Sequence, residues 1–561
     1  MEALDWLVIG VFFLALIGII VWVVRQKQND SADYFLGGRD ATWLAIGASI
    51  FASNIGSEHL IGAGASSGMA MAHWEIQGWM ILILGWVFVP FYSRSMVYTM
   101  PEFLERRYNP QSRTILSVIS LVSYVLTKVA VTVYAGGLVF QQVFGIKELW
   151  GIDFFWIAAI GLVVLTALYT IFGGMKSVLY TSVLQTPILL LGSLIILVLG
   201  FKELGGWDEM MRVCGAVTVN DYGDTMTNLI RSNDDANFPW LGALIGSAII
   251  GFWYWCTDQF IVQRVLSGKN EKEARRGTIF GAYLKLLPVF LFLIPGMIAF
   301  ALHQKYIGAG GEGFLPMLAN GTANADAAFP TLVAKLLPAG VKGLVVCGIL
   351  AALMSSLASL FNSSAMLFTI DFYKRFRPET PEKKLVGIGQ IATVVIVILG
   401  ILWIPIMRSV GDVLYTYLQD VQSVLAPGIA AAFLLGICWK RTSAQGGMWG
   451  LIAGMVIGLT RLGAKVYYSN AGEVADSTFK YLFYDMNWLF FCGWMFLFCI
   501  IVVIVVSLAT KAPTAEKIQG LVFGTATKEQ KAATRASWNH WDIIHTVIIL
   551  AITGAFYWYF W

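Results

Sequence analysis

The chain contains fourteen long apolar stretches, and this feature restricts its fold more than any other. Each stretch is at least as long as the roughly 20 residues that an α-helix needs to cross the hydrocarbon of a bilayer. Only 13% of the 561 residues are charged, against about 25% in ordinary soluble domains. We therefore predict an all-α polytopic membrane protein with fourteen transmembrane helices. The predicted spans are 4–25, 41–69, 74–98, 114–145, 152–172, 177–201, 238–264, 276–303, 340–373, 385–407, 413–438, 446–467, 486–509 and 540–561.

Lysine and arginine residues are unevenly distributed over the loops between these spans. With the N-terminus placed outside, 25 of the 38 basic residues fall on the cytoplasmic side, 11 on the external side and 2 inside spans. Cytoplasmic loops of membrane proteins carry the excess of basic residues. We therefore predict a multi-pass protein of the plasma or inner membrane with both termini external. The net charge of +4 reflects this bias and indicates no nucleic-acid partner.

Two of the predicted spans are interrupted by polar or small residues. The second span contains residues 51–59 (FASNIGSEH), and the seventh contains residues 251–259 (GFWYWCTDQ). Hydrocarbon offers no partners for free N–H and C=O groups, so such breaks persist only within protein or beside a watery cavity. Interrupted helices at matching positions of two halves indicate an inverted-repeat transporter with its site near the midplane.

The interruptions lie five spans apart, which predicts two five-helix repeats within one membrane transporter domain, residues 1–561. Repeat one covers approximately residues 41–201 and repeat two approximately 238–438. The helices at 4–25, 446–467, 486–509 and 540–561 are then peripheral.

Several polar side chains lie inside the apolar spans, where an ionised group usually faces a cavity or a partner. Together they offer many hydrogen-bond donors and acceptors, which suits a neutral polyhydroxyl solute because each hydroxyl both donates and accepts. The rings of residues 253–255 (WYW) offer flat apolar faces for a sugar, although an aromatic belt at the membrane interface explains them equally. Lys128, in the fourth span, has no partner that the sequence identifies. The candidate polar residues are Asn54, His59, Glu75, Lys285 and Gln419.

Each of these polar residues also has a purely structural interpretation, and the residue pattern alone leaves both open. An interfacial position suits Glu75, and Lys285 can extend its aliphatic stem to the interface. His59 can be a packed histidine. Asn54 and Gln419 can bond neighbouring helices.

Residues 350–362 (LAALMSSLASLFN) contain two adjacent hydroxyls, Ser355 and Ser356, inside the ninth span. Hydroxyls in a membrane helix can bond back to carbonyls of their own helix. They can also bind Na⁺, together with carbonyls freed by a broken helix. The carbonyls near Ala52 and Ile55, in the interrupted second span, are the natural complement.

These motifs together resemble the sodium/glucose cotransporters of the solute:sodium symporter family. The resemblance rests on residues 51–59, 253–264 (WYWCTDQFIVQR), 283–288 (YLKLLP), 354–362, 417–419 (YLQ) and 433–441 (FLLGICWKR), and it covers most of residues 30–465. It implies a fourteen-helix protein with a five-plus-five inverted repeat, the LeuT-like fold, and alternating access.

The resemblance also implies roles for individual residues. The sugar ligands would be Asn54, His59, Glu75, Trp255, Lys285 and Gln419. Tyr254 would close the intracellular side, and Trp74 and Tyr415 would belong to the outer gate. The sodium ligands would be the backbone carbonyls of Ala52, Ile55 and Ala352 and the hydroxyls of Ser355 and Ser356.

The chain departs from the family pattern at four positions. Relatives with a second sodium carry an acidic residue in place of Ser182 and a hydroxyl in place of Ala358, so we predict one sodium per sugar. Gly251 stands where relatives often direct a polar side chain at the sugar. Ala63 replaces a bulkier residue of the outer gate.

The predicted function is secondary active symport of Na⁺ with a hexose of the glucose or galactose type. A sodium-coupled symporter for inositol or another polyol is the nearest alternative, because inositol presents the same hydroxyl chemistry. An alternative of another class is a membrane sugar sensor that does not transport. No nucleophile–base pair indicates an enzyme, and no phosphate-binding loop indicates ATP-driven transport.

Overall fold

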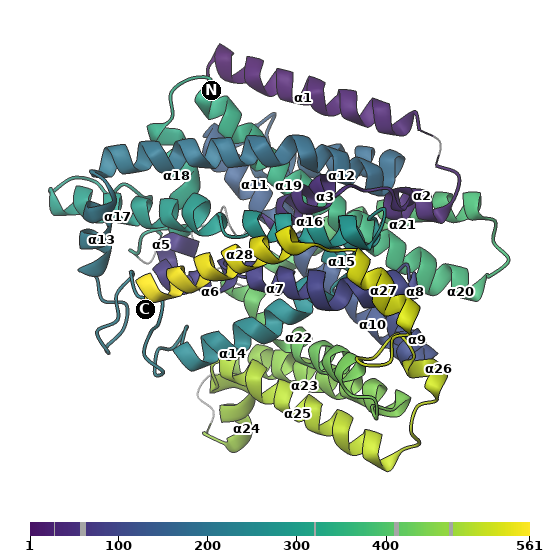
Figure 1. Cartoon of the computed structure of the whole chain (residues 1–561). Helices are drawn as coiled ribbons and strands as arrows, with labels where there is room; N and C mark the ends of the chain where they lie inside the picture. Colours follow the sequence, from purple (N-terminus) through teal and green to yellow (C-terminus); the bar gives the residue numbers. More distant parts are fainter. Residues whose placement is uncertain (27, 57–62, 319–320, 409–413, 471–474) are drawn as a thin grey trace.

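The structure is a computed structural model that describes residues 1–26, 28–56, 63–318, 321–408, 414–470 and 475–561. It consists almost entirely of helices (Figure 1). Its two strands, β1 (Glu148–Leu149) and β2 (Ile152–Asp153), form one short antiparallel hairpin.

The long helices occupy the predicted spans. They are α1 (Ala3–Val24), α3 (Trp43–Asn54), α7 (Gly78–Ile83), α8 (Val89–Ser95), α10 (Pro110–Ser123), α11 (Ala130–Phe144), α12 (Phe154–Leu204), α14 (Trp240–Gly251), α15 (Gln259–Leu266), α16 (Glu271–Leu284), α17 (Ile294–Gly308), α19 (Val341–Met366), α21 (Glu382–Arg408), α22 (Leu414–Cys438), α23 (Ala444–Asn470), α25 (Trp488–Ala509) and α28 (His540–Tyr559). Shorter helices join them: α2 (Ser31–Leu36), α5 (Ala63–Ser67), α6 (Ala72–Glu75), α9 (Met100–Arg107), α13 (Trp207–Gly215), α18 (Ala328–Leu336), α20 (Lys374–Phe376), α24 (Thr478–Lys480), α26 (Ala515–Ile518) and α27 (Lys528–Ala536).

Among the described residues, twelve helical stretches are long and apolar enough to cross a membrane. One of them, α12, has 51 residues and corresponds to two predicted spans. Gly174 interrupts it with φ 52° and ψ −147°, and the Ser177 hydroxyl donates to the carbonyl of Tyr169 at 3.1 Å. Residues eight apart in a continuous helix would be about 12 Å apart, so the chain reverses at Gly174. The all-α polytopic class is therefore confirmed, whereas the count of fourteen stays a prediction.

The predicted interruption of the second span is present. Helix α3 ends at Asn54, and Ile55 has the extended dihedrals φ −75° and ψ 93°. The carbonyls at this end consequently leave the helical hydrogen-bond ladder. The helix resumes as α5, beyond residues 57–62, which lie outside the described part.

The predicted interruption of the seventh span lies at Asp258. A π-helical segment, η5 (Phe252–Thr257), continues α14. Asp258 alone separates η5 from α15. Asp258 has φ −78° and ψ 127°, and its carboxylate accepts a bond from the N–H of Phe260 at 3.3 Å. Asp258 therefore serves as the N-cap of the second half-helix.

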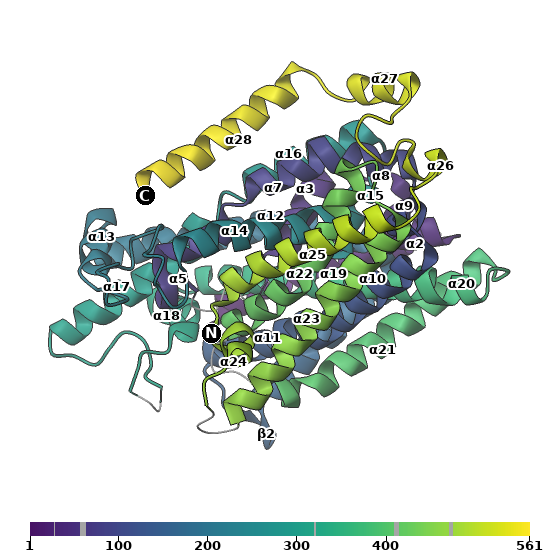
Figure 2. The ribbon, with the colours of Figure 1, turned by 90° about the horizontal axis from the view of Figure 1, so that it is seen from below.

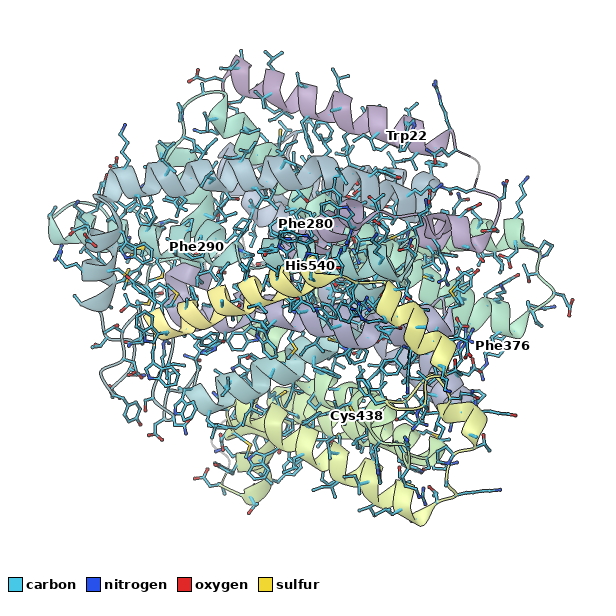
Figure 3. All side chains as sticks on the ribbon, in the orientation of Figure 1. Trp22, Phe280, Phe290, Phe376, Cys438 and His540 are labelled. Atoms are coloured by element: carbon cyan, nitrogen blue, oxygen red, sulfur yellow. The ribbon has the colours of Figure 1, made fainter. Side chains whose placement is uncertain are left out.

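The long helices run in broadly the same direction across Figures 1 and 2, with α19 at the centre and α1 and α28 at the outside. Most of the apolar window of α19 is buried (89%), against 22% for α1 and for α28. Trp22, at the outer edge, is 51% exposed (Figure 3), and α28 also exposes large apolar side chains such as Val547, at 58%. Such a broad exposed apolar surface is unfavourable in water and is expected where helices face lipid.

Both chain termini lie at the same end of the bundle (Figures 1 and 2). The helices α9, α20, α26 and α27, which carry predicted cytoplasmic basic residues, lie at the opposite end. This arrangement fits an even number of crossings. Which end faces the cytoplasm, and where the two repeats begin and end, stay predictions.

Candidate substrate and ion site

A buried ion pair joins the first half of the chain to the second. Glu75 is the last residue of α6, and Lys285 directly follows α16. Lys285 Nζ lies 2.8 Å from Glu75 Oε2, and the two side chains are only 3% and 10% exposed. A single charge left unpaired at such a place is strongly destabilising. The pair thus provides charged donors and acceptors within an electrically neutral site.

An aromatic face and an amide border this ion pair. Lys285 Nζ lies 5.6 Å from the centre of the Trp255 ring, and Trp255 Nε1 donates to Gln77 Oε1 at 3.0 Å. Gln77 Nε2 donates in turn to the carbonyl of Ser247 at 3.0 Å. A Cβ on Gly251 would come within 2.8 Å of the Gln77 carboxamide. The Gln77 carboxamide therefore occupies the space that a side chain at position 251 would fill.

Asn54 connects the end of α3 with the aromatic segment. Its Nδ2 donates to the hydroxyl of Tyr254 at 3.3 Å, and the Tyr254 ring lies 4.9 Å from that of Trp255. Asn54 Oδ1 is buried and has no hydrogen-bond partner among the described residues. A buried amide oxygen without a donor is costly, and a ligand hydroxyl would supply that donor.

The other predicted site residues either make further contacts beside Glu75 or lie outside the described part. Trp74 is 6% exposed and stacks on Trp488 at 5.6 Å. His59 lies outside the described residues, as do the side chains of Tyr415 and Gln419. The structure therefore places Glu75, Lys285, Trp255, Tyr254 and Asn54 in one connected region; the roles of all these residues stay predictions.

The predicted sodium ligands come from α3 and α19, which lie against each other. Ser356 Oγ donates to the carbonyl of Ser53 at 2.9 Å and to that of Ile55 at 3.2 Å. Both carbonyls belong to the interrupted end of α3. Ala52 and Ala352 are buried on the same two helices, Ala352 one helical turn before Ser356.

Ser355 belongs to a neighbouring cluster of hydroxyls. Its Oγ lies 3.2 Å from Ser182 Oγ and 3.5 Å from Ser53 Oγ. Ser53 Oγ also lies 2.8 Å from Ser359 Oγ and accepts a 2.8 Å bond from Arg264 Nη2. These oxygens are hard donors of the kind that alkali and alkaline-earth cations prefer.

Several residues of this region escaped the sequence analysis. Gln77 stands two positions after Glu75. A second polar residue so close to the first in an apolar span could have indicated that it belongs to the same site. Ser53 and Arg264 lie inside motifs that carried the family resemblance, without a role of their own. Lys128 proves to be paired with Asp258, at 2.5 Å between Nζ and Oδ2.

Comparison with known proteins places this geometry in a family. A family model described as "Sodium:solute symporter family" matches residues 34–454. The sodium/myo-inositol cotransporter 2 of Mus musculus is 36% identical over 542 residues, which cover 94% of this chain and 80% of that protein. The sodium/glucose cotransporter 4 of Danio rerio is 35% identical over 537 residues, covering 92% of this chain and 80% of that protein.

A solved structure of a Na⁺-coupled sialic acid symporter has the same fold, with a TM-score of 0.73 and 22% identity. The match covers 91% of this chain and 99% of that one. It confirms the LeuT-like fold that the resemblance implied. Transporters of this kind are not enzymes, and Na⁺ is the ion they carry together with the solute. The chain belongs to the sodium:solute symporter family and is a multi-pass, sodium-coupled solute symporter.

Proposed function

We propose that this symporter carries a neutral cyclic polyol, with myo-inositol as the first candidate, together with Na⁺. The observation that carries the proposal is the buried pair of Glu75 and Lys285 beside the ring of Trp255. Its opposite charges cancel, so the site favours neither an anion nor a cation. Its oxygens and nitrogens can instead bond several hydroxyls while the ring of the solute stacks on the indole.

The relatives favour inositol over the glucose-type hexose that the family resemblance implied. The mouse relative is named for myo-inositol at 36% identity, and the zebrafish relative for glucose at 35%. A hexose therefore remains the second candidate. Both solutes are six-membered rings with several hydroxyls, so the same ligands serve: Asn54, His59, Glu75, Trp255, Lys285 and Gln419.

In the proposed cycle, external Na⁺ binds first and bridges α3 and α19. It replaces the hydrogen bonds of Ser356 to the freed carbonyls with coordination by the same oxygens, with Ser355, Ala52 and Ala352 completing the set. The polyol then binds, Trp74 and Tyr415 close above it, and Tyr254 moves to open the inner side. One charge moving through 100 mV supplies about 2.3 kcal/mol.

We further propose one sodium per polyol. A second cation beside Ser182 would meet a neutral hydroxyl instead of a carboxylate. Ala358 adds no oxygen. The protein would work in a plasma or inner membrane with both termini external, since this orientation keeps the basic loops inside.

The test is uptake by proteoliposomes that contain the purified full chain. Labelled myo-inositol should accumulate in an inward sodium gradient and not in a potassium gradient, with D-glucose, D-galactose and a sialic acid as competitors. Stronger competition by D-glucose than by unlabelled inositol would make the hexose the substrate. Binding without accumulation or counterflow would indicate the sensor, and equal accumulation in potassium would refute sodium coupling.

A further inference from the structure

The buried pair of Lys128 and Asp258 is a prominent feature that the cycle above does not use. Its side chains are only 8% and 2% exposed. Lys128 lies in η4 (Tyr124–Val129), a π-helical segment between α10 and α11, and Asp258 is the extended residue between η5 and α15. The pair therefore ties the interruption of the second half to a helix of the first half.

Aromatic rings and a carboxylate surround this ammonium. Lys128 Nζ lies 4.8 to 5.1 Å from the ring centres of four aromatic residues, which are Tyr124, Trp253, Tyr254 and Phe260. Ring faces attract cations, most strongly where water is excluded. The Tyr124 hydroxyl also donates to the Asp258 carboxylate. Because Tyr124 and Lys128 both lie in η4, two bonds from one segment hold Asp258 against it.

Lys128 also shares a cavity with Ser356, one of the proposed sodium ligands. The residues that line this cavity of about 30 Å³ include Lys128, Tyr254, Ser53, Gly56 and Ser356. This volume holds about one or two water molecules. Two cations at the edges of so small a space repel each other strongly unless a carboxylate neutralises one of them.

We propose that Lys128 is the positioning charge that expels sodium toward the cytoplasm, and that Asp258 masks this charge until the inner side opens. While α15 lies against η4, the pair is neutral and the cavity tolerates Na⁺. When α15 separates, the ammonium is left beside Ser356 without its carboxylate, and the ion is driven out. The inference rests on the proposed sodium site at Ile55 and Ser356.

The coupling is reciprocal, as linkage requires. An ammonium that repels Na⁺ in the opened state makes a bound Na⁺ oppose the separation of Lys128 from Asp258. The same pair would therefore bias the loaded ion site against inward opening. A polyol that stacks on Trp255, three residues before Asp258, is well placed to offset this bias through η5.

The test measures binding of radioactive sodium to the purified full chain, with sodium as the only probe. Lys128→Gln leaves a carboxylate near the ion, so sodium should bind about tenfold more tightly. Asp258→Asn leaves an unmasked ammonium, so sodium should bind about tenfold more weakly; asparagine also keeps the N-cap of α15. A purely structural pair would shift both variants in the same direction, and that result would overturn the proposal.

A lone buried charge can prevent folding, so the double variant Lys128→Gln/Asp258→Asn carries a prediction of its own. Equilibrium binding should return to within about twofold of the parent, because neither charge remains. Release of bound sodium into sodium-free buffer should nevertheless be about fivefold slower, because no ammonium is left to expel the ion. Release at the parent rate would refute the proposal.

A second buried pair provides the matched control. Arg113 lies 2.7 Å from Asp371, with exposures of 12% and 0%, and neither residue lines the cavity. Arg113→Gln/Asp371→Asn should leave sodium binding and release unchanged. The variant Ser356→Ala distinguishes failure of the proposed ion site from failure of the proposed role of the pair. If this variant binds sodium normally, the ion site itself is refuted. If it loses sodium binding while the Lys128 and Asp258 variants bind and release sodium like the parent protein, only the role of the pair is refuted.

Discussion

The two interrupted helices of this symporter are broken in chemically different ways. At the end of α3, the freed carbonyls of Ser53 and Ile55 accept bonds from the hydroxyl of Ser356, on another helix. At the start of α15, the break is capped by its own carboxylate, Asp258, which also pairs with Lys128. The first break thus uses neutral oxygens, and the second uses full charges.

The difference suggests a division of labour between the two halves. Neutral hydroxyl-to-carbonyl bonds contribute about 0.5–1.5 kcal/mol each, so an alkali ion can replace them at little cost. A buried ion pair is costly to separate, so its opening needs to be coupled to another event. The first break is therefore suited to reversible ion binding, and the second to control of the inner side.

We expect the largest effect when the hydroxyls beside the interrupted end of α3 are removed, and this variant tests the proposed difference between the two interruptions most directly. Ser355→Ala/Ser356→Ala should reduce sodium-stimulated polyol uptake by at least about 100-fold, because each lost ligand weakens the ion site by a few kcal/mol. Initial uptake rates in proteoliposomes measure this. Thr166→Val is the control, since its buried hydroxyl bonds only the carbonyl of Leu162 in its own helix. Undiminished stimulation in the double serine variant would place the ion elsewhere.

A second substitution tests whether the charges above the second break serve the solute. Glu75→Gln should raise the KM for the polyol about 10- to 100-fold, with sodium binding nearly unchanged, because it removes a charged acceptor and leaves Lys285 unpaired. Uptake against polyol concentration gives the KM. The exposed pair of Glu209 and Arg212 supplies the control Glu209→Gln. If Glu75→Gln weakened sodium binding more than polyol binding, the proposed separation of the ion site from the solute site would be wrong.

A smaller effect is expected from Tyr124, the second partner of Asp258. Tyr124→Phe removes the hydroxyl that donates to this carboxylate from η4, so one bond fewer opposes the separation of Asp258 from η4. Sodium release should become about two- to threefold faster, in line with the loss of one hydrogen bond. Tyr92→Phe is the control, because its buried hydroxyl bonds the carbonyl of Cys256 instead. Slower release in Tyr124→Phe would contradict the masking role of Asp258.

The interruptions could be predicted from sequence because they are local events. Polar and small residues at 51–56, within an apolar stretch, indicate a break whatever surrounds them, and α3 does end at Asn54. The reversal within α12 follows from the same kind of local signal, since Gly173 and Gly174 separate two predicted spans. Helix existence and helix breaks therefore required no knowledge of packing.

The pairings could not be predicted, because they depend on how distant helices pack. Lys128 and Asp258 are 130 residues apart, and Glu75 and Lys285 are 210 apart. Sequence alone singled out Glu75, Lys128 and Lys285 as charged residues inside apolar spans, and it assigned a partner to none of them. The departure at Gly251 predicted a missing solute contact, whereas the carboxamide of Gln77 occupies that space. Such compensation is visible only once the helices are in place.

A carboxylate outside the membrane spans allows the cost of burying such a group to be measured separately. Asp326 lies in the short helix η7 (Ala325–Ala327), and burial raises its pKa to about 6. The folded state then holds a proton more tightly than the unfolded chain, whose carboxyl has the ordinary pKa of 3.8. The stability from this group is complete below about pH 4 and is lost as the pH rises through 6.

Asp326→Asn should therefore stabilise the protein at pH 7.5, by at most about 1–3 kcal/mol, and the gain should vanish near pH 4. Thermal unfolding of the purified protein in detergent, followed by tryptophan fluorescence at both pH values, measures the difference. Glu312→Gln changes an exposed carboxylate of the same loop and should be neutral at both. If Asp326→Asn is neutral at pH 7.5, the ionised form of Asp326 costs the fold nothing, and the raised pKa of this group is contradicted.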